Sequence, residues 1–515
     1  MENSIWGFHG TTLQRVGKVA ICLLFLVPAS GYGQDDIEPE LPAKNPNASG
    51  FVNDTLPPDD SNPVSLAPGQ SPEAAPYESQ IQSSSSEGVP QAPLNTAFAP
   101  PDLLVGSIYQ GGIPSLNPSQ LLPSPIRQSI ARTWEGRQPG ASSQGGYNFK
   151  IGEAKFQLGM GLGVEANDNI FASETGREGD IILHPEVQFS TAIRLSDLNT
   201  LQFGLGVSYN AYMNHSDQDS VSISPGSQVA FTIYAGDFRI QLHDQFSLEQ
   251  SPTLQPSVNN VANTGDFTNT IGTLVTWDLN KMLLSFGYDH INTFSTQSNA
   301  GYPAQWNDNF TLTDAVTIDS SLQAGLESSI TTTHYGQASD GGQYQDSTQA
   351  SLGPFALWRL TAVTSIQAGI GYSEAFFNSN GLTSGASQSG GAWYGDFTVN
   401  QRVNSHVTQS LSVGREASSG LNASYQQIEF LRHQATWNII DKVGLGTSFY
   451  IGKTSQTGGS AADRTTQYGA GITLGWQLNS KITVSSQYQF IYEASDTRGA
   501  SYTQNQIDLN FNYHF

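Results

Sequence analysis

The chain of 515 residues has one cysteine, few charged residues and no long hydrophobic run. The cysteine, Cys22, lies in an amino-terminal stretch that we expect to be removed, so the mature protein should contain no thiol. This excludes a disulfide framework and any cysteine-ligated metal site. No stretch approaches the roughly 20 apolar residues of a transmembrane helix, so we expect none in the mature chain. Charged residues are 13% of the chain, whereas Phe and Tyr number 25 and 20.

Residues 1–33 have the parts of a secretory signal peptide. Arg15 and Lys18 precede a short apolar run at 19–27, and small residues follow it up to Gly33. This pattern predicts export and cleavage after Gly33.

Residues 34–145 are rich in Pro, Ser, Asn and Ala and have no apolar periodicity. Such a segment buries too little surface to offset the entropy of folding, so we predict a disordered periplasmic arm. One stretch, which starts at Ser124-Pro125, places Ile126, Ile130 and Trp134 on one helical face. It is compatible with a helix that docks on a partner or plugs a barrel, or with a transient turn.

The net charge is -23. This excess of carboxylates repels phosphate groups and argues against nucleic acid as a partner.

From residue 146 to 515, apolar and polar residues alternate, as they do in strands with one apolar and one polar face. Tight turns such as Asn280-Lys281 and Asn479–Lys481 alternate with long polar loops such as 251–266 and 378–390. The pattern predicts an all-β fold, a transmembrane antiparallel barrel of about 18 strands with turns in the periplasm and loops outside the cell.

The last twelve residues, QNQIDLNFNYHF, alternate up to the carboxy-terminal Phe515. They resemble the closing strand of bacterial outer-membrane barrels, which the outer-membrane assembly machinery reads. The resemblance implies location in the outer membrane and contact with its lipid, with Phe511, Tyr513 and Phe515 as the assembly signal. The alternative is an amphipathic edge strand of a soluble sheet.

Two belts of aromatic residues are expected where the barrel wall meets the membrane interfaces. The periplasmic belt comprises tryptophans two to four residues before a tight turn: Trp277, Trp358, Trp437 and Trp476. The other belt comprises aromatics near the long loops: Tyr212, Phe294, Tyr335, Phe376, Tyr425, Tyr468 and Tyr492. The apolar stripe changes phase near Pro354 and after Phe430, which predicts β-bulges at both places.

No catalytic, cofactor or metal motif stands out. Glycines 159, 161 and 163 lie inside an alternating strand with no helix after them, so they do not predict a dinucleotide site. The sequence has no nucleophile elbow and no zinc-protease motif, and its histidines are dispersed. Asn167-Asp168-Asn169 and Asp217-Gln218-Asp219 could ligate calcium, but such loops are more often only solvated.

Residues 163–171, GVEANDNIF, and 180–187, DIILHPEV, carry a second resemblance. They resemble the opening of the beta-barrel porin type 2 family, in which the first strand ends in an Asp-Asn-Ile-Phe-like turn. The resemblance implies an outer-membrane barrel, and several members are linked to the production and export of exopolysaccharide.

If the apolar stripes face lipid, the alternate residues face the lumen, and an excess of carboxylates there predicts a preference for cations. The lumen candidates are Glu165, Glu186, Arg194, Arg239, Asp289, Glu327, Asp396, Arg402, Glu493 and Asp508. The expected function is an outer-membrane pore for saccharides or for export of exopolysaccharide, and not an enzyme. The rival is a non-conducting barrel whose arm, 34–145, binds a periplasmic or polysaccharide-export partner; an outer-membrane hydrolase is third.

Overall fold

The computed structural model of the protein describes residues 147–196, 198–251, 260–297, 303–336, 344–378, 389–420, 423–457 and 463–515. The predicted signal peptide and arm, with the amphipathic stretch at 124–134, lie outside these residues. Among the helices that the structure describes, none is long and apolar enough to cross a membrane.

The described chain is almost entirely antiparallel sheet, with one short 3-10 helix, η1 (Ser216–Gln218). Strands β2 to β19 are 12 to 17 residues long, whereas β1 has three. The strands are β1 (Phe149–Ile151), β2 (Ala154–Asn167), β3 (Asp180–Ser196), β4 (Asn199–Tyr212), β5 (Ser220–Ala235), β6 (Phe238–Glu249), β7 (Asp266–Asp278), β8 (Met282–Ser295), β9 (Gln305–Thr317), β10 (Leu322–Tyr335), β11 (Ser347–Thr361), β12 (Thr364–Phe377), β13 (Ser389–Arg402), β14 (Val407–Ser418), β15 (Tyr425–Ile440), β16 (Val443–Thr457), β17 (Arg464–Gln477), β18 (Ile482–Ser495) and β19 (Tyr502–His514).

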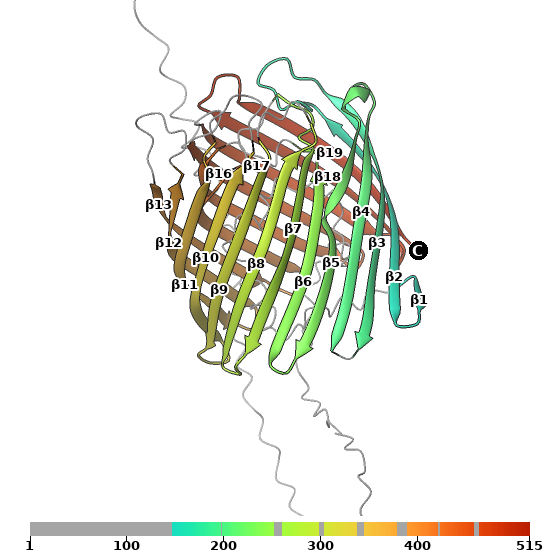
Figure 1. Ribbon diagram of the computed structural model, residues 1–515. Coiled ribbons are helices and arrows are strands. Elements are labelled where there is room, and N and C mark those ends of the chain that lie inside the picture. Colours follow the sequence, from blue (N-terminus) through green and yellow to red (C-terminus); the bar gives the residue numbers. More distant parts are fainter. Residues whose placement is uncertain are drawn as a thin grey trace, which may run out of the picture. The chain divides into compact units, whose positions relative to one another are not determined.

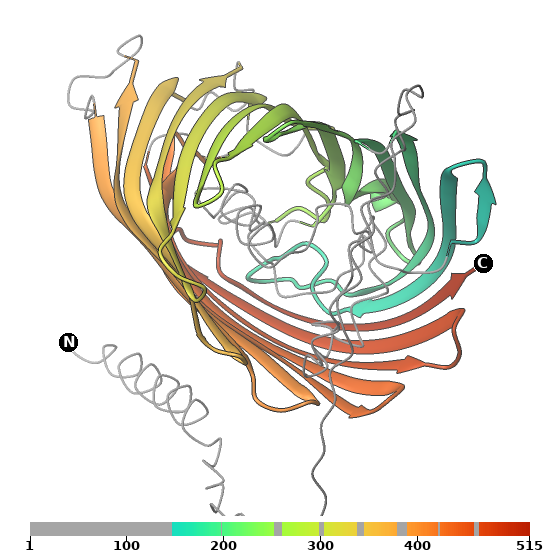
Figure 2. The same ribbon diagram turned by 90° about the horizontal axis from the view of Figure 1, so that it is seen from below.

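Each strand from β2 to β18 pairs with the next one, and β19 pairs with β2, so 18 strands close into a barrel (Figures 1 and 2). Closure runs from the pair Asn167 and Gln506 to the pair Gly159 and His514. A closed barrel leaves no unpaired strand edge, which is a requirement for a sheet in hydrocarbon. The predicted fold and strand number are confirmed.

The tight turns follow from short polar side chains that replace backbone partners. In the turn after β17, Asn479 Oδ1 accepts hydrogen bonds from the backbone N–H groups of Lys481 and Ile482, at 2.8 and 3.0 Å. Asn404 and Asp319 make the same two bonds in the turns after β13 and β9. Such Asx turns reverse the chain in few residues and set the register of the hairpin.

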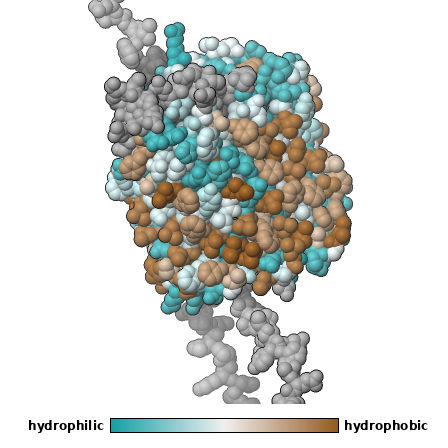
Figure 3. Space-filling model, viewed as in Figure 1, coloured by the Kyte–Doolittle hydropathy of each residue, from teal (hydrophilic) through white to brown (hydrophobic). Residues whose placement is uncertain are grey.

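The outer face of the barrel is apolar. Exposed Leu, Ile, Val, Phe and Trp side chains occupy alternate positions of the strands, and they form broad brown areas in Figure 3. The four tryptophans of the predicted periplasmic belt are all among these exposed side chains. An apolar outer band on a closed barrel of 18 antiparallel strands is the form in which bacterial proteins span the outer membrane, and the protein lies there.

The two bulges predicted from the phase changes are wrong. The pairing of β10 with β11 runs unbroken through Pro354, and the pairing of β14 with β15 runs unbroken through Phe430. The phase changes arise because some inward-facing residues are apolar: Phe355 packs with Leu283 and Ala315, and Phe430 with Tyr450. In the hydrophobicity pattern of the sequence, apolar residues inside the barrel therefore look the same as a shift of register.

A register shift that the sequence reasoning missed lies in β5. Both pairings of this strand change register around residues 224–226, between Ile223 and Ser227 on the β6 side. Pro225 lies at this point and has no N–H to donate to a neighbouring strand, which suits an irregular ladder position.

The second predicted aromatic belt holds only in part. Phe294, Phe376 and Tyr492 are exposed, as expected, whereas Tyr212 and Tyr425 are buried and Tyr335 is partly buried. The hydroxyl of Tyr212 donates to Asn263 Oδ1 at 3.0 Å, and that of Tyr335 donates to the carbonyl oxygen of Gly420 at 2.8 Å. Both partners belong to long loops, so these rings help to fix the loops.

Strand β1 completes the seam between the first and last long strands. Its residues pair with residues 154–156 of β2, whereas β19 pairs with β2 only as far as Gly159. Asn148 joins both sides: its Nδ2 donates to the carbonyl oxygen of Phe515, and its Oδ1 accepts from the N–H of Leu158. The rings of Tyr513 and Phe515, two residues of the predicted assembly signal, meet edge to face at 5.0 Å.

We expect Asn148→Ala to loosen this seam. Two hydrogen bonds are lost, each worth about 1 kcal/mol, so the free energy of unfolding should fall by roughly 2 kcal/mol. The measurement is the temperature at which the folded, heat-modifiable band on a gel is lost. Asn400→Ala, on β13, is the matched control; equal melting of the two variants would contradict a role of Asn148 in the seam.

Candidate functional site

The ten predicted lumen residues all lie on the strand face opposite the exposed apolar side chains. Six of them are buried: Glu165, Glu186, Arg239, Glu327, Glu493 and Asp508. Asp289, Asp396 and Arg402 are partly buried, and Arg194 is exposed. The structure brings Glu165 and Asp508 together as paired positions of β2 and β19, whereas most of the others are spread over the wall.

The inner wall at the seam is acidic and polar. Glu165 Oε1 accepts hydrogen bonds from Asn167 Nδ2 at 2.9 Å and Gln506 Nε2 at 3.1 Å, and its Oε2 lies 3.3 Å from His184 Nε2. Glu165 and Asp508 are each only 2% exposed. Within the described part of the chain neither is paired with a lysine or arginine. Two neighbouring carboxyl groups with no lysine or arginine beside them favour cations near this wall.

The glycines of β2 make room for this polar surface. A Cβ atom on Gly163 would lie 2.6 Å from Asn510 Oδ1, and one on Gly161 would lie 2.8 Å from Asn512 Oδ1. Their lack of a side chain therefore lets the asparagines of β19 lie across the inner face of β2. The glycine run serves packing inside the barrel and opens no helix.

The inner wall also carries an arginine that the sequence reasoning missed. Arg432 on β15 lies over the rings of Phe430 and Tyr450, with its Cζ 6.0 and 5.8 Å from the ring centres. Because a bulge was expected after Phe430, the phase of these residues was misjudged. Cation–π contacts hold the guanidinium on the inner face, several strands away from the acidic seam.

The first long loop, 168–179, folds inward at the mouth of the barrel. Ile170 packs with Ile182 and Tyr212 on the inner wall, and Ala172, which is fully buried, packs with Ile491 and Tyr502. Figure 2 shows this turquoise loop within the ring of strands. The motif residue Asn169 fixes it, because its Nδ2 donates to the carbonyl oxygens of Ser173 and Thr503, each at 2.9 Å.

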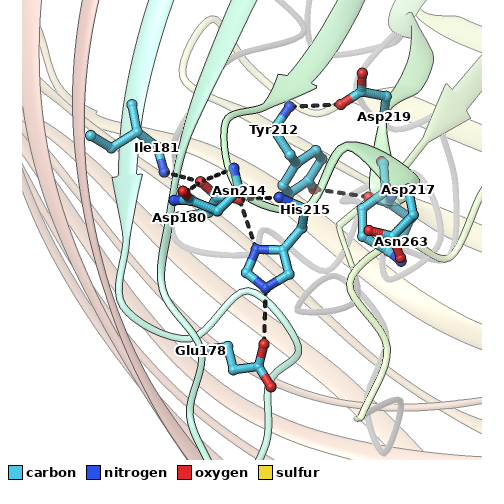
Figure 4. Close-up of polar contacts among 10 residues, drawn as sticks. Glu178, Asp180, Ile181, Tyr212, Asn214, His215, Asp217, Asp219 and Asn263 are labelled. Carbon is cyan, nitrogen blue, oxygen red and sulfur yellow. Dashed lines mark hydrogen bonds and ion pairs between the residues drawn. The ribbon is translucent and has the colours of Figure 1, made fainter.

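His215, in the loop after β4, clamps the same loop from the other side (Figure 4). Its Nδ1 lies 2.8 Å from Asp180 Oδ2 and its Nε2 lies 2.9 Å from Glu178 Oε2. Only the doubly protonated imidazolium donates from both ring nitrogens. The hydrogen bonds to Asp180 and Glu178 accordingly raise the pKa of His215 above its ordinary value of 6.5. The sequence reasoning missed His215, which lies 35 positions from Asp180.

A second loop folds inward from another part of the wall. In the loop between β14 and β15, Ser419 Oγ is within 3.2 Å of both Gln305 Nε2 and Thr333 Oγ1, on β9 and β10. Tyr335 holds the same loop through Gly420 and Ala423. Two loops at the same end of the barrel are therefore attached to separate parts of the inner wall.

Among the residues that the structure describes, no three His, Cys, Asp or Glu side chains are arranged to hold a metal ion. In the pair Asp217 and Asp219, considered for calcium, the carboxylate of Asp219 already accepts two hydrogen bonds. They come from the N–H of Tyr212 at 2.8 Å and from the hydroxyl of Tyr209 at 3.0 Å. In the other candidate, Asp168 binds Asn505 through the backbone N–H and the side-chain amide.

No family model and no curated protein matches the chain, so the porin type 2 resemblance stays a prediction. Solved outer-membrane proteins are similar to it at low identity. OccAB3 of Acinetobacter baumannii is 10% identical, with a TM-score of 0.42, over 71% of this chain and 100% of its own. OpdL of Pseudomonas aeruginosa is 12% identical, with a TM-score of 0.42, over 71% and 100%. OccK2 (OpdF) of the same species, solved with glucuronate, is 9% identical, with a TM-score of 0.43, over 71% and 99%.

The hydrogen bonds of His215 predict that the accessibility of the loop at 168–179 to protease depends on pH. Because the pKa of His215 is raised, the clamp is complete at pH values below 6.5 and is lost as pH rises through the raised pKa. The charged groups against the ring are Glu178 and Asp180, and Phe171 meets it edge to face. Trypsin cleavage after Arg177, followed by mass spectrometry, should therefore increase with pH over the range in which the enzyme works.

His215→Ala should be cleaved after Arg177 at all these pH values, because neither carboxylate is then held. Cleavage after Arg498, in the loop before β19, corrects for the change of trypsin activity with pH. A ratio of the two cleavages that stays constant with pH in the wild type would contradict the clamp.

Proposed function

We propose that the protein is an outer-membrane pore that passes hydrophilic solutes, with saccharides as the substrate class and with a preference for cations. The observation that carries the proposal is the polar inner face, which runs around a barrel of 18 strands. A barrel of this size is wider than its opposed side chains can fill, so its interior holds water. The inward loops then act as a constriction at its mouth.

Amide side chains support the choice of saccharides. Both donors and acceptors are needed to bind sugar hydroxyls, and glutamine and asparagine supply both. Inward-facing amides on β2, β3, β18 and β19 are Asn167, Gln188, Gln489, Gln504, Asn510 and Asn512. Export of exopolysaccharide rests on the family resemblance alone, and the two inward loops favour passage of small saccharides over a polymer chain.

Ion selectivity is the first test. Planar-bilayer recordings of the purified protein under a gradient of potassium chloride should give a reversal potential of cation-selective sign, weaker at high salt because charges are screened beyond about 8 Å at physiological salt. Glu165→Gln with Asp508→Asn should move the reversal potential toward zero. The matched control Glu429→Gln, on the exposed outer face, should leave it unchanged.

An anion-selective reversal potential would overturn the cation preference, and absence of any steady open level would overturn the pore and favour a non-conducting anchor.

The second test concerns the constriction. Replacement of residues 170–177 by two glycines removes the inward part of the first loop, while Asp168 and Asp180 remain. Single-channel conductance should rise, because the narrowest part of a pore dominates its resistance. Unchanged conductance, with the barrel still folded by heat modifiability, would show that this loop does not lie in the conducting path.

A further inference from the structure

The outer wall carries a row of polar residues on β6 to β9. Asp244, His290 and Asp308 point to the apolar outer face, and with Ile271 they form one row of paired positions across these strands. Figure 3 shows a hydrophilic area among the brown surface on the side of the barrel that it displays. Ionisable residues on a lipid-facing wall are rare and are a sign of function.

The row lies within the hydrocarbon layer and not above it. His290 is six residues along β8 from Leu284, the partner of the belt residue Trp277. On the extracellular side of the row, Phe267 and Phe294 contact each other with ring centres 5.1 Å apart. On the periplasmic side lie exposed apolar side chains, including Phe286, Phe310 and Leu312. Aromatic and aliphatic side chains therefore bracket the row above and below.

The polar groups of the row satisfy one another only in part. His290 Nδ1 lies 2.8 Å from Asp308 Oδ1, which also accepts from the hydroxyl of Tyr288 at 2.9 Å. Asn269 Nδ2 donates to Asp244 Oδ1 at 2.6 Å. Among the described residues, nothing bonds to His290 Nε2 or Asp308 Oδ2. Lipid tails offer no partner, and a polar group left without one in hydrocarbon costs free energy.

We propose that this row is an interface at which a second copy of the chain docks about a two-fold axis. The leftover groups are self-complementary: His290 has Nε2, which donates when the imidazole carries both protons, and Asp308 has Oδ2 to accept. A two-fold axis brings the same patch of both copies together, so His290 of each copy meets Asp308 of the other. Both leftover groups are then satisfied away from lipid.

The chemistry of the row selects a copy of the chain over an anionic lipid headgroup. Asp244 and Asp308 repel phosphate, and the imidazole of His290 is already engaged by Asp308. Another charged pair on the outer wall, Arg415 with Glu429, lies on β14 and β15, and these two residues pair with each other at 3.8 Å. That pair supplies a matched control.

Disulfide cross-linking in native outer membranes tests the interface. Asn292 points outward on β8, two residues from His290, and Asn292→Cys near a two-fold axis should form a disulfide-linked dimer under mild oxidation. The variant is made in a Cys22→Ser background. Val413→Cys, exposed on the outer face of β14, is the control and should stay monomeric.

A second experiment replaces His290 and Asp308, the two residues with leftover groups. His290→Leu with Asp308→Leu, added to Asn292→Cys, should abolish the cross-link, and Arg415→Leu with Glu429→Leu should keep it. If the first double variant does not fold by heat modifiability, His290→Gln with Asp308→Asn replaces it. In lipid nanodiscs the wild type should have twice the mass of the monomer. A monomeric wild type, no cross-link through residue 292, or a cross-link that survives the double replacement would overturn the interface.

Discussion

Every backbone N–H and C=O group in a hydrocarbon layer needs a partner, and the rest of this structure depends on how the chain meets that need. Pairing of β19 with β2 satisfies the last two free edges, and β1 with Asn148 continues the seam to the carboxy terminus. Once the sheet is closed, each strand has one face toward lipid and one toward the interior. The period of two in the sequence then decides which residues can carry function.

The sequence predicted the closed barrel, the strand number and the tight turns because these follow from local patterns. Alternation marks a strand, and Asn404 or Asn479 makes its turn with its own neighbours. It failed where inward-facing residues are apolar. Phe355 and Phe430 pack inside the barrel, and a hydrophobicity pattern alone cannot distinguish an inner apolar patch from a change of register.

The mouth was less predictable than the wall because its contacts join distant parts of the chain. The motif at 163–171 was noticed as a resemblance, yet the structural role of the loop that it opens appears only when Asn169 contacts Thr503 and Glu178 contacts His215. Likewise Tyr212 and Tyr335 were assigned to lipid, whereas their hydroxyl groups bind loop residues on the inner side of the barrel. The inner wall combines an acidic, amide-rich seam with a separate arginine on β15, so groups of opposite charge lie on different strands of the wall.

The central claim is that the barrel has lipid on one face and water on the other. Single cysteines placed in turn at 408 to 413 of β14, in a Cys22→Ser background, test it directly through their reaction with a small, charged, membrane-impermeant thiol reagent. The structure requires fast reaction at even positions, which face the interior and are partly exposed there, and slow reaction at odd positions, which face lipid. Uniformly slow reaction at both sets, or reaction without a period of two, would contradict the account.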